Sequence, residues 1–233
     1  MTELLTVKDL TYKKSQKTIL NHLNLTLSTG KIVAMLGLNG AGKTSLMRVI
    51  AGEAQNWRGQ VAVAGEEKAP LRKANISFTD NLSAFRGGTK IRTVVGFYAD
   101  LFPDFDREEF GKMAAFMNID TDLRLRELSR GMKEKVVIAL TLARQTQLYL
   151  LDEPFSGIDP LTRKRIINSL LLWKNNQATI VISDHFVNEI ASILDEVVII
   201  KDQNVAAHRS TDDIREKGQS IEEFFESFYG EED

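Results

Sequence analysis

The alternation of hydrophobic and polar positions near the start of the chain predicts strands with one face in water. Residues 19–27 place three leucines at every second position, with Asn24 and Thr26 between them. A period of two is typical of strands in an antiparallel sheet that covers a core on one side. Residues 4–7 form a second apolar segment that is also expected to be a strand. We therefore expect an antiparallel β subdomain at the N-terminus.

Further along, the apolar positions merge into continuous runs, which are typical of strands buried on both faces. These runs are residues 31–36, 148–151, 179–183 and 197–200, and residues 74–78 are expected to form a further strand. Helical stretches separate them, such as residues 161–173, with Asp159 as a possible N-cap and Pro160 at the first helical position. This strand–helix–strand alternation predicts an α/β fold built on a parallel sheet with right-handed crossovers.

Two segments depart from this alternation. Residues 83–135 lack a buried strand, contain Gly87, Gly88 and Pro103, and are predicted to form a mostly helical insertion. Residues 216–233 are predicted to form a short C-terminal helix, with Phe224, Phe225 and Phe228 on one side. The remaining residues, about 1–82 and 136–215, are expected to form the core of a single domain.

Composition narrows the function classes. The 233 residues are 43% hydrophobic and 27% charged, which is ordinary for a soluble globular protein. The net charge of −2 gives no reason to expect a nucleic-acid partner, which usually binds to a basic face. The absence of cysteine excludes disulfides and thiolate metal sites. No apolar run approaches the ~20 residues that span a bilayer, so a role at a membrane requires a partner.

Residues 37–44, GLNGAGKT, match the phosphate-binding pattern G-x-x-x-x-G-K-[ST]. The glycines let backbone N–H groups close around phosphate oxygens, and the helix that follows directs its N-terminus at the same anion. Lys43 is expected to reach the β- and γ-phosphates, and the Thr44 hydroxyl to bind Mg²⁺. The residues expected to bind nucleotide are Gly37, Asn39, Gly40, Ala41, Gly42, Lys43, Thr44 and Ser45.

Carboxylates follow one of the buried strands. Residues 148–151 lead directly into Asp152 and Glu153, which places both acids at the carboxyl edge of the sheet, where ligands bind in open α/β folds. Asp152 is expected to hold Mg²⁺, directly or through water, and Glu153 to activate the attacking water. His185 follows the next buried strand and is expected either to contact the γ-phosphate or to orient the water.

Residues 128–132, LSRGM, lie about 20 residues before the acid pair and open an apolar helix. They resemble the signature sequence of ABC ATPases, usually written LSGGQ, and the resemblance extends over nearly the whole chain. It implies a P-loop NTPase fold that binds and hydrolyses ATP with Mg²⁺. It also implies that Ser129, Arg130 and Gly131 cap the γ-phosphate of ATP bound to a second subunit.

The resemblance also assigns family motifs to further residues of this chain. Ser156, Gly157 and Asp159 resemble the D-loop, which links the sites across the dimer, and His185 resembles the H-switch. The implied partners are a second ABC ATPase chain, identical or not, and an integral membrane permease contacted by the helical insertion. The implied location is cytoplasmic, attached to the inner face of the membrane through that permease.

The chain departs from the family pattern at several positions. Arg130 stands where the signature usually has Gly, and is either tolerated or slows hydrolysis. The Gln expected after residues 74–78 is missing, and Asp80 or Asn81 takes its place near Mg²⁺. In the family an aromatic residue stacks on adenine, and its expected position is occupied here by Lys14. Tyr12, on the same strand face, either stacks on adenine or belongs to the core.

Residues 97–106, together with the signature segment, resemble bacterial exporters of antimicrobial peptides, antibiotics or toxins, such as the bacitracin-export class. Two alternatives remain. One is an ABC ATPase of DNA repair or translation, although such proteins usually carry two cassettes or long coiled-coil insertions. The other is a regulatory nucleotide-binding module with little hydrolysis, suggested by Arg130 and the missing Gln.

Overall fold

A six-stranded sheet forms the centre of the molecule in the computed structural model, which describes residues 2–79, 81–173, 177–183 and 187–230. Its order is β5-β6-β7-β3-β8-β9. The strands are β3 (Ile32–Leu36), β5 (Ile76–Phe78), β6 (Leu148–Asp152), β7 (Thr179–Ser183), β8 (Glu196–Lys201) and β9 (Asn204–Ser210). All neighbours pair in parallel except β8 and β9, so the predicted parallel sheet is confirmed and carries an antiparallel edge strand.

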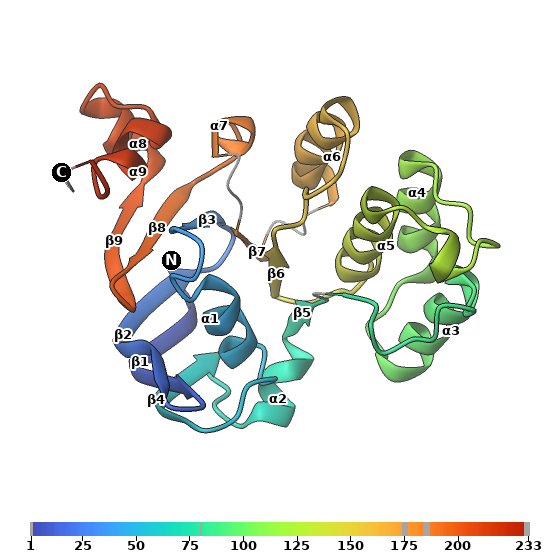
Figure 1. Cartoon of the computed structure of the whole chain (residues 1–233), viewed down its shortest axis with the longest axis horizontal. Helices are drawn as coiled ribbons and strands as arrows, with labels where there is room; N and C mark the ends of the chain where they lie inside the picture. The colour runs from blue at the N-terminus through green and yellow to red at the C-terminus, as the bar shows by residue number, and fades with distance from the viewer. Residues whose placement is uncertain (1, 80, 174–176, 184–186, 231–233) are drawn as a thin grey trace.

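The continuous apolar runs arise because both faces of this sheet are covered. In β3, Ile32, Ala34 and Leu36 point into one hydrophobic cluster, and Val33 and Met35 point into another. All five are buried. The first cluster is completed by helices and the second by α1 (Lys43–Ile50) and the N-terminal strands. Figure 1 shows the sheet between these layers.

The N-terminal strands form a separate antiparallel sheet of order β2-β1-β4, as predicted. It consists of β1 (Glu3–Lys14), β2 (Lys17–Ser28) and β4 (Trp57–Val63). The alternating leucines of β2 face α1, which is enclosed between the two sheets (Figure 1). Sequence reasoning missed β4, which has only two buried positions, Val61 and Val63, and is interrupted by Gly59. The short helix α2 (Ala69–Ala74) follows it.

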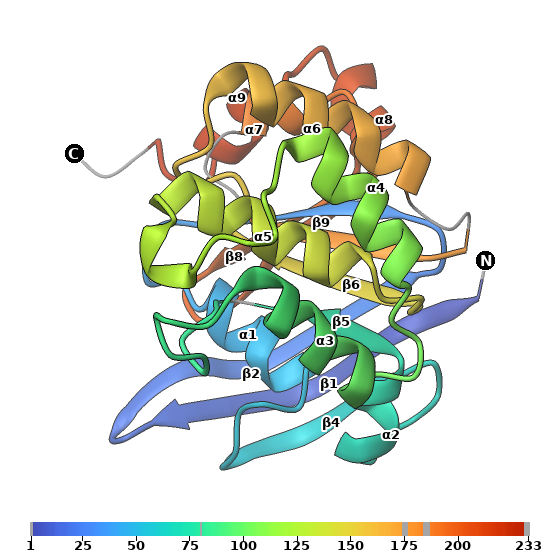
Figure 2. The same cartoon turned by 90° about the vertical axis from the view of Figure 1, so that its right-hand side faces the viewer.

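A helical lobe stands beside the sheet, as predicted for residues 83–135. It contains α3 (Ile91–Leu101), α4 (Arg107–Met117) and a single 3₁₀ turn, η1 (Leu125–Glu127). The long helix α5 (Arg130–Leu142) begins in this lobe and crosses the boundary placed at residue 135. Its second half is buried against the sheet. Figures 1 and 2 show α3, α4 and α5 grouped together, with α6 (Pro160–Trp173) next to α5.

Arg144 fastens this lobe to the sheet. Its Nε and Nη2 donate to the Asp104 carboxylate at 3.1 and 2.9 Å, and its Nη1 donates to the Ile76 carbonyl at 2.8 Å. The guanidinium carbon also lies 4.0 Å from the centre of the Phe102 ring. Arg144 is only 5% exposed, so these contacts are largely shielded from water.

The C-terminal part adds α7 (Val187–Ile190), α8 (Thr211–Glu216) and α9 (Ile221–Glu226). Ser220 and Glu223 form a reciprocal capping box that starts α9. Phe224, Phe225 and Phe228 pack against the core together, which confirms the predicted apolar side of this segment. Throughout the described ranges, the helices are too short or too polar to cross a bilayer.

Candidate active site

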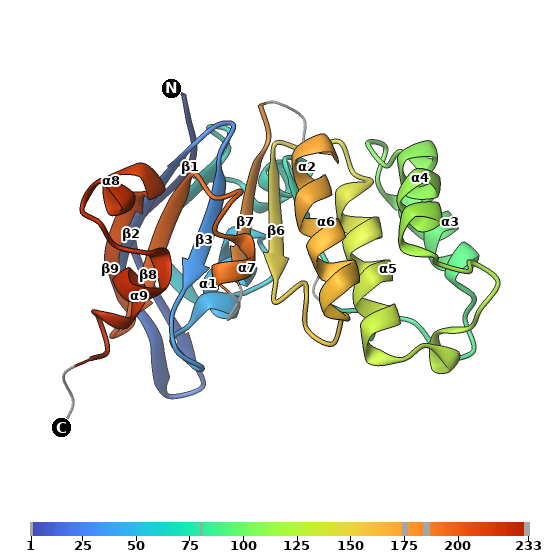
Figure 3. The same ribbon diagram turned by 90° about the horizontal axis from the view of Figure 1, so that it is seen from above.

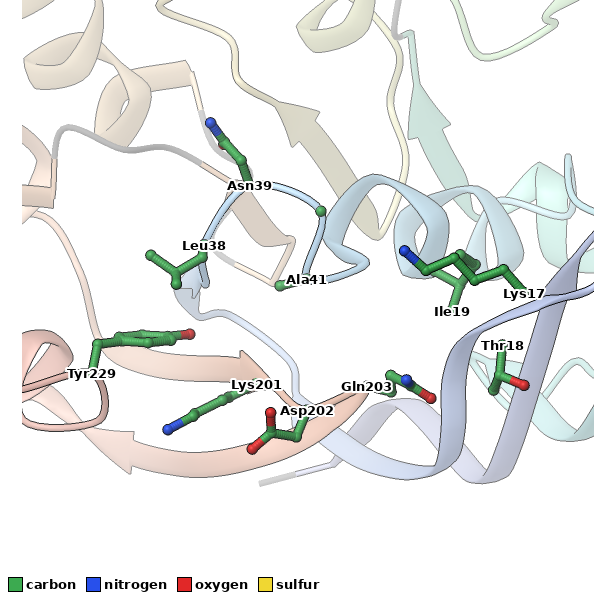
Figure 4. A pocket seen from close by; sticks show the side chains of 11 residues that line it. Lys17, Thr18, Ile19, Leu38, Asn39, Ala41, Lys201, Asp202, Gln203 and Tyr229 are labelled. Carbon is green, nitrogen blue, oxygen red and sulfur yellow. The ribbon is translucent and has the colours of Figure 1, made fainter. Parts of the chain in front are cut away.

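The loop between β3 and α1 is shaped by its glycines. Gly42 caps α1 with a φ of 108°, in the left-handed region that favours glycine. A Cβ at Gly42 would lie 2.9 Å from Leu20 Cδ2, and one at Gly37 would lie 2.5 Å from the Ile200 carbonyl oxygen. The loop therefore fits closely between β2 and β8, and residues 38–40 remain exposed. Figure 4 shows its turn at the start of α1.

Lys43 folds back into this loop. Its ammonium donates to the carbonyl oxygens of Gly37 at 2.5 Å and Leu38 at 3.2 Å, and the residue is 6% exposed. Burial lowers the pKa of Lys43, and the nearby carboxylates of Glu153 and Asp152 partly offset that effect. The structure thus brings the phosphate loop and the acid pair, about 110 residues apart in sequence, into one electrostatic site.

A serine joins the two acids, and sequence reasoning missed it. Asp152 and Ser183 end the neighbouring parallel strands β6 and β7 in register. The Ser183 hydroxyl donates to Asp152 Oδ1 at 2.6 Å. The Glu153 N–H donates to both the hydroxyl, at 3.0 Å, and the carbonyl of Ser183, at 2.9 Å. The available signal was a hydroxyl residue at the end of the strand adjacent to the acids.

Glu153 has a strained backbone. Its φ is 48°, in the left-handed region, which costs a residue with a side chain about 1–2 kcal/mol. The hydrogen bonds to Ser183 hold this conformation and turn the chain sharply after Asp152. Strain of this kind clusters at functional sites, where surrounding contacts fix it.

The residues near the acid pair suit a magnesium ion that arrives with a nucleotide. Thr44 is exposed at the start of α1, and Asp152 is partly buried. Over the ranges with described structure, no group of three or more His, Asp or Glu is placed to hold a metal alone. Magnesium prefers oxygen ligands and commonly combines one or two protein ligands with phosphates and water, which fits this pair.

Asn81 is one of the two residues expected near Mg²⁺ in place of the missing Gln, and the structure describes it. The Asn81 side-chain oxygen accepts the N–H of Ser83 at 2.9 Å, so it participates in a local turn. Asp80 lies outside the described residues, as does His185.

The signature segment and the D-loop segment contact each other within one chain. Ser129 caps α5 by accepting the N–H of Met132 at 3.2 Å. A Cβ on Gly131 would lie 2.2 Å from the Gly157 carbonyl oxygen, so only glycine allows this approach. Arg130 donates to the Ser156 hydroxyl at 2.5 Å.

Asp159 has the structural role predicted for it. Its Oδ1 accepts the N–H of Thr162 at 2.9 Å, and α6 begins at Pro160. The hydrogen bond from the Thr162 backbone lowers the pKa of Asp159, because it stabilises the carboxylate.

The signature segment is remote from the phosphate loop of its own chain. Figures 1 and 3 show α1 and α5 on opposite sides of β6. The phosphate loop and the segment Ser129 to Gly131 thus lie at two separate places on the chain.

Tyr12 packs against the core formed by α1 and the N-terminal strands, paired across the sheet with Leu20 and Trp57. It does not line the cavity beside the phosphate loop. The structure thus favours the core alternative for Tyr12.

Comparison with known proteins supports this arrangement. The sequence model of the ABC transporter family matches residues 20–156. The lantibiotic transport ATP-binding protein SrtF of Streptococcus pyogenes is 27% identical over 95% of this chain and 96% of its own length. The bacitracin transport ATP-binding protein BcrA of Bacillus licheniformis is 30% identical over 96% of this chain and 75% of its own.

The fold is similar to that of a solved ATP-binding subunit of an ABC transporter, with a TM-score of 0.84 and 25% identity over 96% of this chain and 98% of that one. The match therefore includes the antiparallel sheet, the parallel sheet and the helical lobe. The chain belongs to the ABC transporter family, as an ATP-binding subunit that hydrolyses ATP to drive transport.

Proposed function

We propose that two protomers, either two copies of this chain or this chain and a close relative, bind two ATP–Mg²⁺ at a shared interface. Each ATP lies between Gly37 to Ser45 of one protomer and Ser129 to Gly131 of the other. One observation carries this proposal: α1 and α5 lie on opposite sides of β6, so no chain caps its own phosphate loop. ATP then favours the closed dimer, because the capping contacts exist only there.

In this proposal the residues have distinct roles. Lys43 neutralises phosphate charge, and Thr44 and Asp152 hold Mg²⁺, whose own charge stabilises the transferred phosphoryl group. Glu153 accepts the proton of the attacking water, and Ser183 fixes the backbone that positions it. His185 contributes at the γ-phosphate. Loss of that phosphate removes the charge that bridges the protomers, and the dimer opens.

The partner is proposed to be a membrane permease that exports a peptide antibiotic or toxin. The names of two relatives, a lantibiotic and a bacitracin transport protein, support this cargo class. The helical lobe supplies an apolar surface for the permease, since Phe97 and Leu101 of α3 are 49% and 54% exposed. The chain would then work in the cytoplasm, at the inner face of the membrane.

Disulfide trapping tests the shared site, because the natural chain has no cysteine. We expect Asn39→Cys and Ser129→Cys, combined with Glu153→Gln to slow turnover, to give a covalent dimer that depends on ATP and Mg²⁺. The control variant carries Glu216→Cys on α8 instead of Asn39→Cys, and it should not give the covalent dimer. Intact ATP binding without the Asn39–Ser129 cross-link contradicts the shared site.

Co-expression with the permease tests the cargo. The pair is expected to raise the tolerance of a sensitive bacterium to a peptide antibiotic, and Glu153→Gln is expected to abolish the gain. Unchanged tolerance across a panel of such peptides, despite ATP hydrolysis by the complex, contradicts this cargo class.

A further inference from the structure

A cavity of about 320 Å³ opens beside the phosphate loop, within the size range of small-molecule sites. Four segments line it: residues 38–41 of the loop, residues 17–19 of β2, residues 201–203 at the β8–β9 turn, and Tyr229 after α9. In Figure 4, Leu38 and Tyr229 lie together at one end, and Thr18 and Ile19 lie toward the other.

Tyr229 is held in place by contacts to several of these segments. Its hydroxyl donates to the Ile200 carbonyl at 3.2 Å, and its ring lines the cavity together with Leu38. Lys201 lies with its Nζ 5.2 Å from the centre of the Tyr229 ring and donates to the Phe228 carbonyl at 2.6 Å. Phe225 supports the ring from within α9, with ring centres 5.0 Å apart. The tyrosine is therefore fixed before any ligand enters.

The chemistry of the lining suits a nucleoside. The cavity borders Gly40 and Ala41, whose backbone is expected to bind phosphate, so a base and ribose attached to that phosphate would emerge here. Tyr229 is the aromatic residue of the lining, and aromatic rings bind bases through their π faces or edges. Asp202 and Gln203 offer polar side chains for the sugar hydroxyls or the edge of the base.

We propose that the base and ribose of the nucleotide held by the phosphate loop occupy this cavity, with Tyr229 as its aromatic wall. The C-terminal segment, and not the aromatic residue on β1, thus completes the nucleotide site. The inference rests on the proposed binding of ATP at the phosphate loop.

Comparing ATP with inorganic tripolyphosphate tests this proposal, because the latter has the phosphates without the nucleoside. Dissociation constants of both, with Mg²⁺, are measured by titration calorimetry on the full chain. For wild type we expect ATP to bind at least ten-fold more tightly than tripolyphosphate. Tyr229→Ala should weaken ATP binding by about 5- to 150-fold, the range of base–aromatic contacts, and leave tripolyphosphate binding unchanged.

Two further variants sharpen the comparison. Tyr229→Phe keeps the ring and is expected to retain most of the preference for ATP. Tyr12→Ala removes the competing aromatic residue outside the cavity and is expected to retain that preference fully. The proposal is overturned if Tyr229→Ala keeps the wild-type preference, or if Tyr12→Ala abolishes it.

Misfolding and failure of the proposed function give different signatures. If Tyr229→Ala misfolds, it loses binding of both ligands together. Tyr229→Phe, which keeps the ring, is then the deciding variant. Loss of its preference for ATP, with tripolyphosphate binding intact, would contradict a role for the ring. If wild type binds neither ligand, the proposed function itself is wrong and this inference is lost with it.

Discussion

Arg130 and Ser156 join the first turn of α5 to the loop after β6. The Arg130 guanidinium donates to the Ser156 hydroxyl at 2.5 Å. The Arg130 side chain also packs against Gly157, where an added Cβ would lie 3.3 Å from Arg130 Cγ. The family resemblance implies that Arg130 lies near a phosphate of the neighbouring subunit, and the structure also gives it a partner in its own chain. We expect this contact to make the signature and D-loop segments move together.

A double-mutant cycle tests this coupling. Arg130→Met keeps most of the side-chain bulk and removes the donors, and Ser156→Ala removes the acceptor. Because one hydrogen bond contributes about 0.5–1.5 kcal/mol net, each variant should slow ATP hydrolysis roughly 2- to 13-fold. The double variant should be no slower than the worse single one, as measured by phosphate release. Effects that multiply would instead indicate that Arg130 acts independently, for instance on a phosphate.

Glu153→Gln removes the proposed base and keeps the shape of the side chain. We expect ATP affinity to stay within about two-fold of wild type while turnover falls by about 10²- to 10⁴-fold, the usual contribution of general base catalysis. Light scattering should then show a dimer that persists with ATP and separates with ADP. Glu134→Gln is the matched control on α5 and is expected to hydrolyse ATP well above the Glu153→Gln rate. Wild-type turnover in Glu153→Gln would contradict the assignment.

Lys43 gives ATP binding a characteristic pH dependence. Burial lowers its pKa, so its ammonium loses its proton at a lower pH than that of an exposed lysine. Affinity for ATP is therefore expected to be full below the folded-state pKa and to decrease as pH rises through it. Calorimetry in buffers of different ionisation enthalpy should detect proton uptake on binding in that range.

Lys43→Arg is the control for this effect, because guanidinium keeps its proton over the whole range. Its ATP affinity, although lower, should not depend on alkaline pH. Lys43→Ala is expected to lose ATP binding altogether. A wild-type affinity that is flat up to the pH where exposed lysines titrate would contradict the buried location of the ammonium.

Arg144→Met should destabilise the protein by about 3 kcal/mol, the lower end of the cost of breaking a buried ion pair, since Asp104 remains partly exposed. The loss arises because the Asp104 carboxylate and the Ile76 carbonyl lose their donors. Denaturant unfolding measures it. Arg107→Met, which removes a surface ion pair with Asp100, is the control and should change stability by less than about 1 kcal/mol. Equal stability of the two variants would refute a fastening role for Arg144.

Much of the architecture was available from local pattern. The alternating leucines of β2 indicate a strand with one buried face, and the continuous apolar run of β3 indicates a strand with two. These patterns therefore predicted an antiparallel sheet and a parallel sheet. The strand β4 and the edge strand β9 were missed because their apolar positions are few and sit among polar residues. Their place comes from pairing with β1 and β8.

Some residues of the site were likewise predictable from the sequence, and others were not. The types and spacing of Lys43, Asp152 and Glu153 predicted a phosphate site, because ordered glycines, a lysine and strand-end carboxylates have few other uses together. Ser183 gave no signal alone, since its role depends on parallel register with Asp152.

The sequence by itself determined most of the strands, the phosphate loop and the family, because these follow from local periodicity and short motifs. Only the tertiary structure decided that Arg130 meets Ser156, that Tyr12 joins the core, and that Tyr229 reaches the phosphate loop. Tyr229 lies about 190 residues from that loop in sequence. Contacts at such separation depend on how whole layers pack, and no periodicity along the chain records them.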